Sequence, residues 1–254
     1  MHEPLDYAID AAGIARITIN RPSRANSVDP ALADAMMSAF EHLAAEPKAR
    51  VLVLLGAGRS FCSGIDLNWM KAGGSASRDE NYADALKLAK ILNRLHALPI
   101  PTLAAVSGHT IGFGAGLVAA CDVAVAADTA VFRFSEVRLG IIPAVISPYV
   151  LACIGERNAR RYFLNGESFP AAEAVRIGLI HGHCTLEEFG AVTAQMVAEL
   201  LAGKKHAQTA IKSLLDAVAR PQIDQALMED TARRLADIRA TPEAQAALAD
   251  FLSR

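Results

Sequence analysis

The chain contains 254 residues, enough to bury the core of one large α/β domain with a helical appendage. Its 25 Lys and Arg residues are balanced by 27 Asp and Glu residues, so it lacks the basic excess typical of nucleic-acid-binding proteins, and no nucleic-acid partner is expected. The longest apolar run, Thr110 to Cys121, is shorter than the roughly 20 residues that span a bilayer. These features predict a cytoplasmic protein without membrane contact.

The N-terminal residues predict a β-hairpin followed by a helix. Tyr7 to Asp10 and Ile14 to Asn20 have strand-like patterns and are separated by a short turn. Asp29 and Pro30 then supply a helix N-cap and a proline at the first helical position. The apolar residues that follow at helical spacing are Leu32, Met36, Phe40 and Leu43.

Three short apolar runs predict strands that are covered on both faces, as in a parallel sheet. They are Val51 to Leu55, Thr102 to Val106 and Val123 to Ala127. Between the first two, the polar stretch Ala72 to Asn81 is expected to form a mobile lid, and a helical pattern from Tyr82 to Ala97 follows. From residue 186 onward, Ala, Leu, Glu, Lys and Arg recur at helical spacing, which predicts a helical C-terminal segment.

Two glycine-rich stretches each follow a predicted buried strand and lead toward a helix. They are Arg59 to Leu67 and Ser107 to Gly116. A turn of this kind frees main-chain N–H groups at a helix N-terminus, where they can hold an anion. If the two turns meet, their amides form an oxyanion hole from main-chain donors alone.

Other interpretations of these residues stay open at this point. The glycines could serve only tight turns and close helix packing. A dinucleotide site is disfavoured because Gly112 lies only 16 residues before Asp128, where about 20 are expected. Ser107 and His109 suggest a hydrolase, but no G-x-S-x-G elbow is present. No C-x-x-C pair occurs and the histidines are dispersed, so no metal site is expected.

Several motifs occur in one order along the chain and together are far more specific than any one alone. They are Asn20 to Asn26, Phe61 to Leu67, Val106 to Leu117, Ala120 to Asp122, Ser135 to Pro143, Arg160 to Leu164 and Ala171 to Leu179. This combination resembles the enoyl-CoA hydratase/isomerase family, also called the crotonase family. The resemblance implies an α/β fold with a crotonase-like spiral of ββα turns over residues 1–190 and a helical segment over residues 191–254. It also implies a homotrimer or hexamer.

The resemblance assigns roles to individual residues. The oxyanion-hole donors would be the amides of Ile65 and Phe113, and the acid/base would be Glu136. The residues that would contact an acyl-CoA substrate are Arg24, Ala25, Ser63, Ile65, Asp66, Leu67, Asn68 and Phe113. Coenzyme A would enter as part of the thioester substrate, so no separate cofactor is implied.

Gly116 departs from the family pattern. Well-known hydratases carry a glutamate there in addition to the one that matches Glu136. The run from Glu136 to Tyr149 looks most like hydratases of methylglutaconyl-CoA or isohexenylglutaconyl-CoA type esters. The resemblance therefore implies a lyase of fatty acid metabolism, namely an enoyl-CoA hydratase. A branched or carboxylated acyl group is one of the substrates that the resemblance allows.

Three alternatives to this activity and site are kept. An enoyl-CoA isomerase could shift a Δ3 double bond to Δ2 with the same glutamate and no added water. A non-catalytic paralogue could bind a CoA ester or RNA. Glu136 itself could be a surface carboxylate paired with Arg133 or Arg138.

Overall fold

The computed structural model describes residues 4–219 and 224–252. The chain divides into two compact units, Met1–Val197 and Ala198–Arg254. The strands are β1 (Leu5–Ile9), β2 (Ile14–Ile19), β3 (Val51–Gly56), β4 (Ser60–Cys62), β5 (Thr102–Val106), β6 (His109–Ile111), β7 (Val123–Ala127), β8 (Val131–Arg133), β9 (Ser168–Pro170) and β10 (Gly182–Cys184). The helices are α1 (Pro30–Ala45), α2 (Leu67–Gly73), α3 (Arg78–His96), α4 (Phe113–Ala120), α5 (Ser147–Asn165), α6 (Ala171–Ile177), α7 (Phe189–Ala202), α8 (Lys205–Val218), α9 (Gln225–Arg239) and α10 (Pro242–Leu252), with 3-10 turns η1 (Pro22–Arg24) and η2 (Glu136–Leu139).

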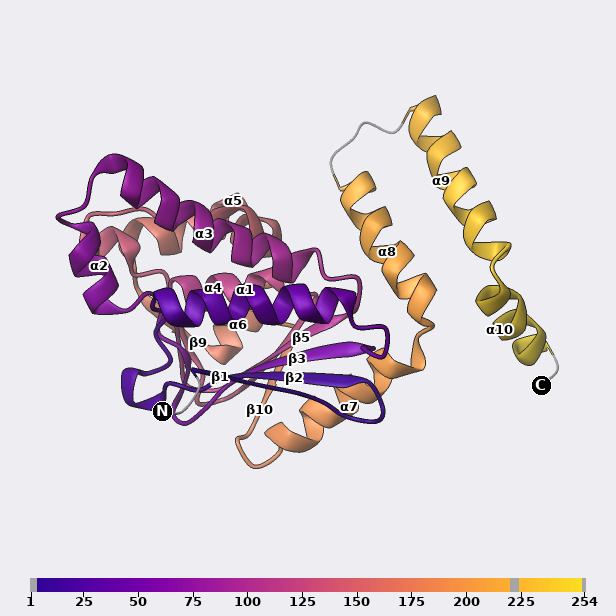
Figure 1. Ribbon diagram of the computed structural model, residues 1–254, viewed down its shortest axis with the longest axis horizontal. Helices are drawn as coiled ribbons and strands as arrows, with labels where there is room; N and C mark the ends of the chain where they lie inside the picture. The colour runs from indigo at the N-terminus through magenta and orange to yellow at the C-terminus, as the bar shows by residue number, and fades with distance from the viewer. Residues whose placement is uncertain (1–3, 220–223, 253–254) are drawn as a thin grey trace. The chain divides into compact units, whose positions relative to one another are not determined.

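The main sheet has six strands in the order β1-β2-β3-β5-β7-β10 (Figure 1). β1 and β2 form the predicted antiparallel hairpin, with Leu5 opposite Ile19. All other neighbours are parallel. The three apolar runs that predicted buried strands are β3, β5 and β7, which lie side by side within this sheet, so that prediction is confirmed.

Helix α1 begins where the sequence predicted it and covers the sheet (Figure 1). Asp29 is the N-cap, and its carboxylate accepts a hydrogen bond from the amide of Leu32 at 2.8 Å. Pro30 occupies the first helical position, where its missing N–H costs nothing. The apolar positions at helical spacing are all buried: Leu32, Met36, Phe40 and Leu43.

A second sheet of short strands has the order β4-β6-β8-β9. β4 and β6 lie inside the two glycine-rich stretches and were not predicted as separate strands, because a three-residue strand has too little periodicity to be recognised. β4 is parallel to β6, and β6 is parallel to β8. The residues that follow these three strands are therefore brought to one edge of the small sheet.

The stretch Ala72 to Asn81 is largely helical and not a long loop, while its role as a mobile lid stays a prediction. α2 runs to Gly73 and α3 begins at Arg78. A capping box fixes this start: the Ser77 hydroxyl accepts from the amide of Glu80, whose carboxylate accepts from the Ser77 amide at 2.8 Å. The Ser-x-x-Glu pattern in the sequence carries this signal and outweighs the two glycines before it.

The C-terminal unit is helical, as the sequence predicted. α8 and α9 pack together, and the Arg234 guanidinium donates to the Ser213 hydroxyl at 3.2 Å. α10 begins at Pro242, and the Glu243 carboxylate accepts from the amide of His206 at 3.0 Å. Within the described residues, none of the helices has both the length and the apolar character required to cross a membrane.

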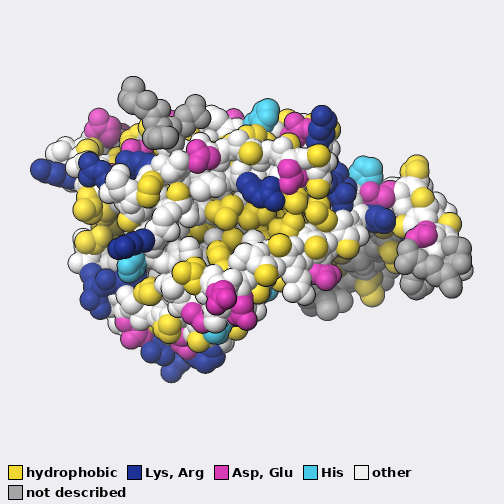
Figure 2. Space-filling view, turned by 90° about the horizontal axis from the view of Figure 1, so that it is seen from below, with side chains coloured by type: hydrophobic (Ala, Val, Ile, Leu, Met, Phe, Trp, Pro, Cys, Tyr) yellow, Lys and Arg dark blue, Asp and Glu magenta, His cyan; other side chains and the backbone are white. Residues whose placement is uncertain are grey.

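Hydrophobic side chains gather on the face of the molecule below the main sheet (Figure 2). A cavity of about 330 Å³ on the main sheet is lined by Ile14 and Val53 from the sheet and by Phe189 and Val197 from α7. This cavity lies outside the predicted substrate-binding residues. The trimeric or hexameric assembly implied by the family resemblance stays a prediction.

The packing of α1 on the sheet predicts the effect of truncating its central side chain. Phe40→Ala is expected to lower the free energy of unfolding by about 3–5 kcal/mol, because it removes a fully buried aromatic ring and leaves a cavity. Urea unfolding followed by circular dichroism measures this loss. Ser38→Ala, at an exposed position of the same helix, is the control and should change stability by less than about 0.5 kcal/mol.

Candidate active site

The functional residues predicted from the sequence follow the three parallel strands of the small sheet. Ile65 lies in the turn after β4, Phe113 begins α4 after β6, and Glu136 begins η2 after β8. Because β4, β6 and β8 are neighbours and run in the same direction, their carboxyl ends share one edge. The small sheet thus brings together residues that are far apart in the sequence.

The main chain before Ile65 closely approaches the main chain at Phe113. Gly64 has a φ of +95° and Gly112 a φ of +53°, conformations that residues with side chains rarely adopt. A Cβ atom at Gly64 would lie 3.9 Å from the amide nitrogen of Phe113, so the two turns lie close together. Among the main-chain hydrogen bonds of the described residues, neither the Ile65 nor the Phe113 amide is a donor. Both N–H groups are therefore available to an oxyanion.

The carboxylate of Glu136 packs against the second turn. A Cβ atom at Gly112 would lie 2.9 Å from Oε1 of Glu136, so only glycine leaves room for the carboxylate. Oε2 is buried and has no hydrogen-bond partner within the described structure. Burial raises the pKa of the Glu136 carboxyl, and a hydrogen bond from its own main-chain amide offsets this only in part. A carboxyl group with one buried oxygen free of partners and a raised pKa is suited to take up and release a proton.

The surface ion pair considered for Glu136 is not formed. Arg133 donates through Nε to the carbonyl of Gly166 at 2.8 Å, and Arg138 donates to the carbonyl of Asn165 at 3.3 Å. Both guanidinium groups therefore bond to the C-terminal end of α5. The interpretation of Glu136 as a paired surface carboxylate is wrong.

The space beside Gly116 is filled by a hydrocarbon side chain. Gly116 is buried in α4, and a Cβ atom there would lie 2.3 Å from Cγ2 of Ile146 and 2.9 Å from its Cβ. Leu92 is the next neighbour, at 3.6 Å. The missing glutamate is therefore replaced by tight apolar packing and not by another polar group.

A polar cleft of about 460 Å³ opens beside the first turn. Seven of the eight residues predicted to bind the substrate line it, together with Ser27: Arg24, Ala25, Ser63, Ile65, Asp66, Leu67 and Asn68. The eighth, Phe113, is not on its wall, and its side chain is buried. The structure thus places the Phe113 side chain in the core and not on the wall of this cleft.

Asp66 holds the wall of this cleft in place. Its carboxylate caps α2 by accepting from the amide of Asn68 at 2.9 Å and also accepts from the Ser27 hydroxyl at 3.2 Å. Burial raises the pKa of Asp66, but these hydrogen bonds and the charges of Arg21 and Arg24 outweigh it, so the pKa is lowered overall. Arg21, which was not among the predicted site residues, lies 3.4 Å from Asp66 and donates to the Ser27 carbonyl. Arg24 stays exposed at the cleft.

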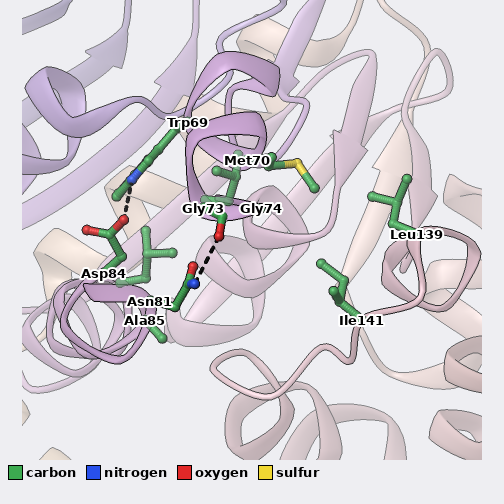
Figure 3. Close-up of a pocket in the computed structure, with 11 residues that line it drawn as sticks. Trp69, Met70, Gly73, Gly74, Asn81, Asp84, Ala85, Leu139 and Ile141 are labelled. Carbon is green, nitrogen blue, oxygen red and sulfur yellow. Dashed lines mark hydrogen bonds between the residues drawn. The ribbon is translucent and has the colours of Figure 1, made fainter. Parts of the chain in front are cut away.

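An apolar pocket of about 640 Å³ shares Ile65 with the polar cleft (Figure 3). Besides Ile65, its walls come from α2, from α3, from the last residue of η2 and from the segment that follows η2. The hydrophobic side chains on these walls include Trp69, Met70, Ala85, Leu88, Leu139 and Ile141. Ile65 therefore separates a polar compartment from an apolar one.

Metal binding has no support in the described part of the chain. Across residues 4–219 and 224–252, no group of three or more His, Cys, Asp or Glu side chains could hold a metal ion. His183 and Asp128 form a pair at 2.5 Å, exposed where β10 lies beside β7.

Comparison with known proteins shows which family shares this sequence and this fold. The family described as Enoyl-CoA hydratase/isomerase matches residues 10–254. A hydroxycinnamoyl-CoA hydratase-lyase of Pseudomonas fluorescens is 33% identical over 194 residues, which is 74% of this chain and 70% of that protein. The crystal structure of an enoyl-CoA hydratase from Shewanella pealeana has a TM-score of 0.95 with 34% identity and covers 98% of this chain and 93% of its own. Pseudomonas aeruginosa AtuE has a TM-score of 0.94 with 31% identity, covering 98% and 96%.

The chain belongs to the enoyl-CoA hydratase/isomerase family and has the crotonase fold. It is an enzyme of the crotonase type, as the resemblance found in the sequence predicted. The narrower likeness to hydratases of methylglutaconyl-CoA or isohexenylglutaconyl-CoA type esters stays a prediction.

The tight packing at Gly116 predicts that even a methyl group is not tolerated there. Gly116→Ala is expected to lower the free energy of unfolding by about 1–3 kcal/mol, because its Cβ would overlap Ile146. Gly116→Ala should cost less stability when it is made in the Ile146→Ala variant than when it is made in the parent, because the overlapping side chain is then gone. A double-mutant cycle in urea measures this coupling. Gly182→Ala, where a Cβ would meet nothing within 4 Å, is the control.

The burial of Glu136 predicts a stability that depends on pH. Its raised pKa means that the ionised form is disfavoured in the folded state, so Glu136→Gln should be more stable than the parent at pH values above the raised pKa. The difference should vanish below the ordinary pKa of glutamate, where both side chains are neutral. Thermal unfolding between pH 4 and pH 8 tests this, with the exposed Glu156→Gln as the control. A variant that is less stable than the parent at pH 8 would contradict the assignment of an unpaired buried carboxylate.

Proposed function

We propose that this enzyme is an enoyl-CoA hydratase, which adds water across the double bond of a 2-enoyl-CoA thioester. The observation that carries the proposal is the meeting of three strand ends, where the Gly64 turn lies close to the Phe113 amide and the carboxylate of Glu136 packs against Gly112. Relatives named as hydratases support water addition as the reaction.

The two compartments beside Ile65 fit the two halves of such a substrate. The coenzyme A portion would occupy the polar cleft, where the exposed Arg24 is a suitable partner for a phosphate group. The thioester would lie at Ile65, and the acyl chain would extend into the apolar pocket. Burying an acyl chain there contributes about 0.8 kcal/mol per methylene group.

In the proposed reaction, Glu136 removes a proton from water as the water oxygen forms a bond to Cβ of the enoyl group. The electron pair of the double bond then moves toward the thioester and places negative charge on its oxygen. The amides of Ile65 and Phe113 would donate to that oxygen, and one such donor is typically worth about 3–4 kcal/mol. The proton held by Glu136 is finally returned to Cα, so hydrogen and hydroxyl are both added to the substrate.

A single carboxylate has to perform both proton transfers in this scheme. Ile146 fills the space at Gly116, so no second glutamate assists. A raised pKa helps Glu136 in this double role, because the group then titrates closer to neutral pH, where it can both accept and release a proton.

The presence of a single carboxylate also favours a second candidate function, that of an enoyl-CoA isomerase. An enzyme with a single carboxylate can move a proton from Cγ to Cα of a 3-enoyl-CoA without adding water, which is the isomerase reaction. Both reactions pass through an oxyanion on the thioester, so they require the same pair of amides. Product analysis separates them.

The proposal predicts a large loss of activity in Glu136→Gln. Hydration of crotonyl-CoA, followed by loss of absorbance of the conjugated thioester, should fall by about 10²–10⁴ in kcat, because the amide cannot accept the proton from water. Mass spectrometry of the product shows whether water is added, and a 3-enoyl-CoA substrate tests double-bond migration in the same preparation.

Glu156→Gln is a matched control, since it removes the same charge from an exposed position on α5. Equal hydration rates for Glu136→Gln and the parent would overturn the role of Glu136. Migration of the double bond without water addition would establish the isomerase instead. Tight binding of acyl-CoA without turnover of any substrate would identify a non-catalytic paralogue.

A further inference from the structure

The apolar pocket contains two polar side chains on α3 that the proposed reaction does not use. Asp84 and Asn81 both line the pocket, one turn apart on the same helix (Figure 3). Trp69 and Gly73 of α2 lie opposite them. These polar groups bear on which acyl groups the pocket accepts.

The side-chain N–H donors on this wall already have acceptors. The indole Nε1 of Trp69 donates to Oδ2 of Asp84 at 2.6 Å (Figure 3). The side-chain amide of Asn81 donates to the carbonyls of Gly73 at 2.9 Å, Ser77 at 3.1 Å and Ala76 at 3.3 Å. The polar atoms left over, the Asp84 carboxylate and the Asn81 carbonyl oxygen, can only accept hydrogen bonds when Asp84 is ionised.

No cationic side chain compensates the charge of Asp84. None of the described residues that line the pocket is Lys, Arg or His, and Asp84 forms no ion pair with any described residue. Lys87, one turn further along α3, is held at 2.8 Å from Asp34. Lys71 is exposed and is not part of the wall. The pocket is therefore apolar with a local negative charge and without a free side-chain donor.

We propose that Asp84, held by the indole of Trp69, is a specificity-determining residue that makes the pocket accept uncharged acyl chains and reject chains that end in a carboxylate. The proposal rests on the proposed function, because it assigns this pocket to the acyl group. It removes the carboxylated esters from the substrates that the family resemblance allowed and retains the uncharged branched ones.

The physical reason is both electrostatic and a matter of hydrogen bonding. A carboxylate that enters the pocket loses water and finds no N–H group on these side chains to replace it. It also meets the like charge of Asp84 in surroundings less polarisable than bulk water. An uncharged chain incurs neither cost.

Binding of unreactive saturated esters tests the proposal without depending on catalysis. Isothermal titration measures Kd for two pairs of equal chain length, hexanoyl-CoA against adipoyl-CoA and octanoyl-CoA against suberoyl-CoA. The parent protein should bind the uncharged member of at least one pair about tenfold more tightly, and this ratio should shrink as ionic strength rises. In Asp84→Asn, which keeps an acceptor oxygen for Trp69, the ratio should shrink to about threefold or less.

Asp79→Asn is the matched control, because it removes the same charge from an exposed position of the same helix. It should leave the ratio of affinities unchanged. Equal affinity of the parent for both members of both pairs would overturn this inference while leaving the hydratase proposal intact. Failure of all four esters to bind would instead overturn the assignment of the chain's site to acyl-CoA.

Discussion

The arrangement of this site depends on the close approach of main chain at the carboxyl edge of the small parallel sheet. The turn at Gly64 lies close to the Phe113 amide, and the turn at Gly112 leaves room for the carboxylate of Glu136, which follows the next strand of the small sheet. A Cβ atom at Gly64 would lie 3.0 Å from the Ile111 carbonyl oxygen, and one at Gly112 would displace the Glu136 carboxylate. The polar N-terminal segment reinforces the approach, since the amide of Val28 donates to the Gly64 carbonyl and the amide of Asp66 donates to the Val28 carbonyl, both at 2.8 Å.

The structure combines one unfavourable burial with extensive favourable packing. Leaving Oε2 of Glu136 buried without a partner costs free energy that a surface carboxylate would not lose. The chain that leads to Glu136 is anchored by two fully buried aromatic side chains, Phe132 on β8 and Phe134 just after it. Such packing can hold an unfavourable group in place, which is a common property of catalytic sites.

The sequence predicted most elements that have either length or a strong local signal. The strands β3, β5 and β7 are apolar throughout, and α1 has both a cap and a clear period, so these were recognised from the residues alone. Residues of the site were located through the family resemblance, because the glycine turns by themselves fit several kinds of protein. The start of α3 was misplaced, since glycines near a helix start were taken as a loop.

Contacts between side chains that are distant in the sequence could not be predicted from the sequence. Nothing in the sequence around Gly116 indicates that Ile146 fills the space beside it, and nothing around Arg21 shows that it joins Asp66 to the N-terminal segment. The bond between Trp69 and Asp84 joins two helices whose crossing had to be seen first. Periodicity and motif spacing describe one element at a time, whereas these contacts arise only from the fold.

The contact between Gly116 and Ile146 also limits how this enzyme can evolve. A lineage that gained a glutamate on α4 first would pass through an intermediate with overlapping atoms in its core, and selection would remove it. The route that stays foldable begins with a smaller residue on the loop before α5, which opens space, and adds the acidic side chain afterwards. Directed evolution toward a site with two carboxylates therefore requires the substitution at position 146 before, or together with, the one at position 116. Libraries that vary both positions will reach such a site, whereas single-site libraries will not.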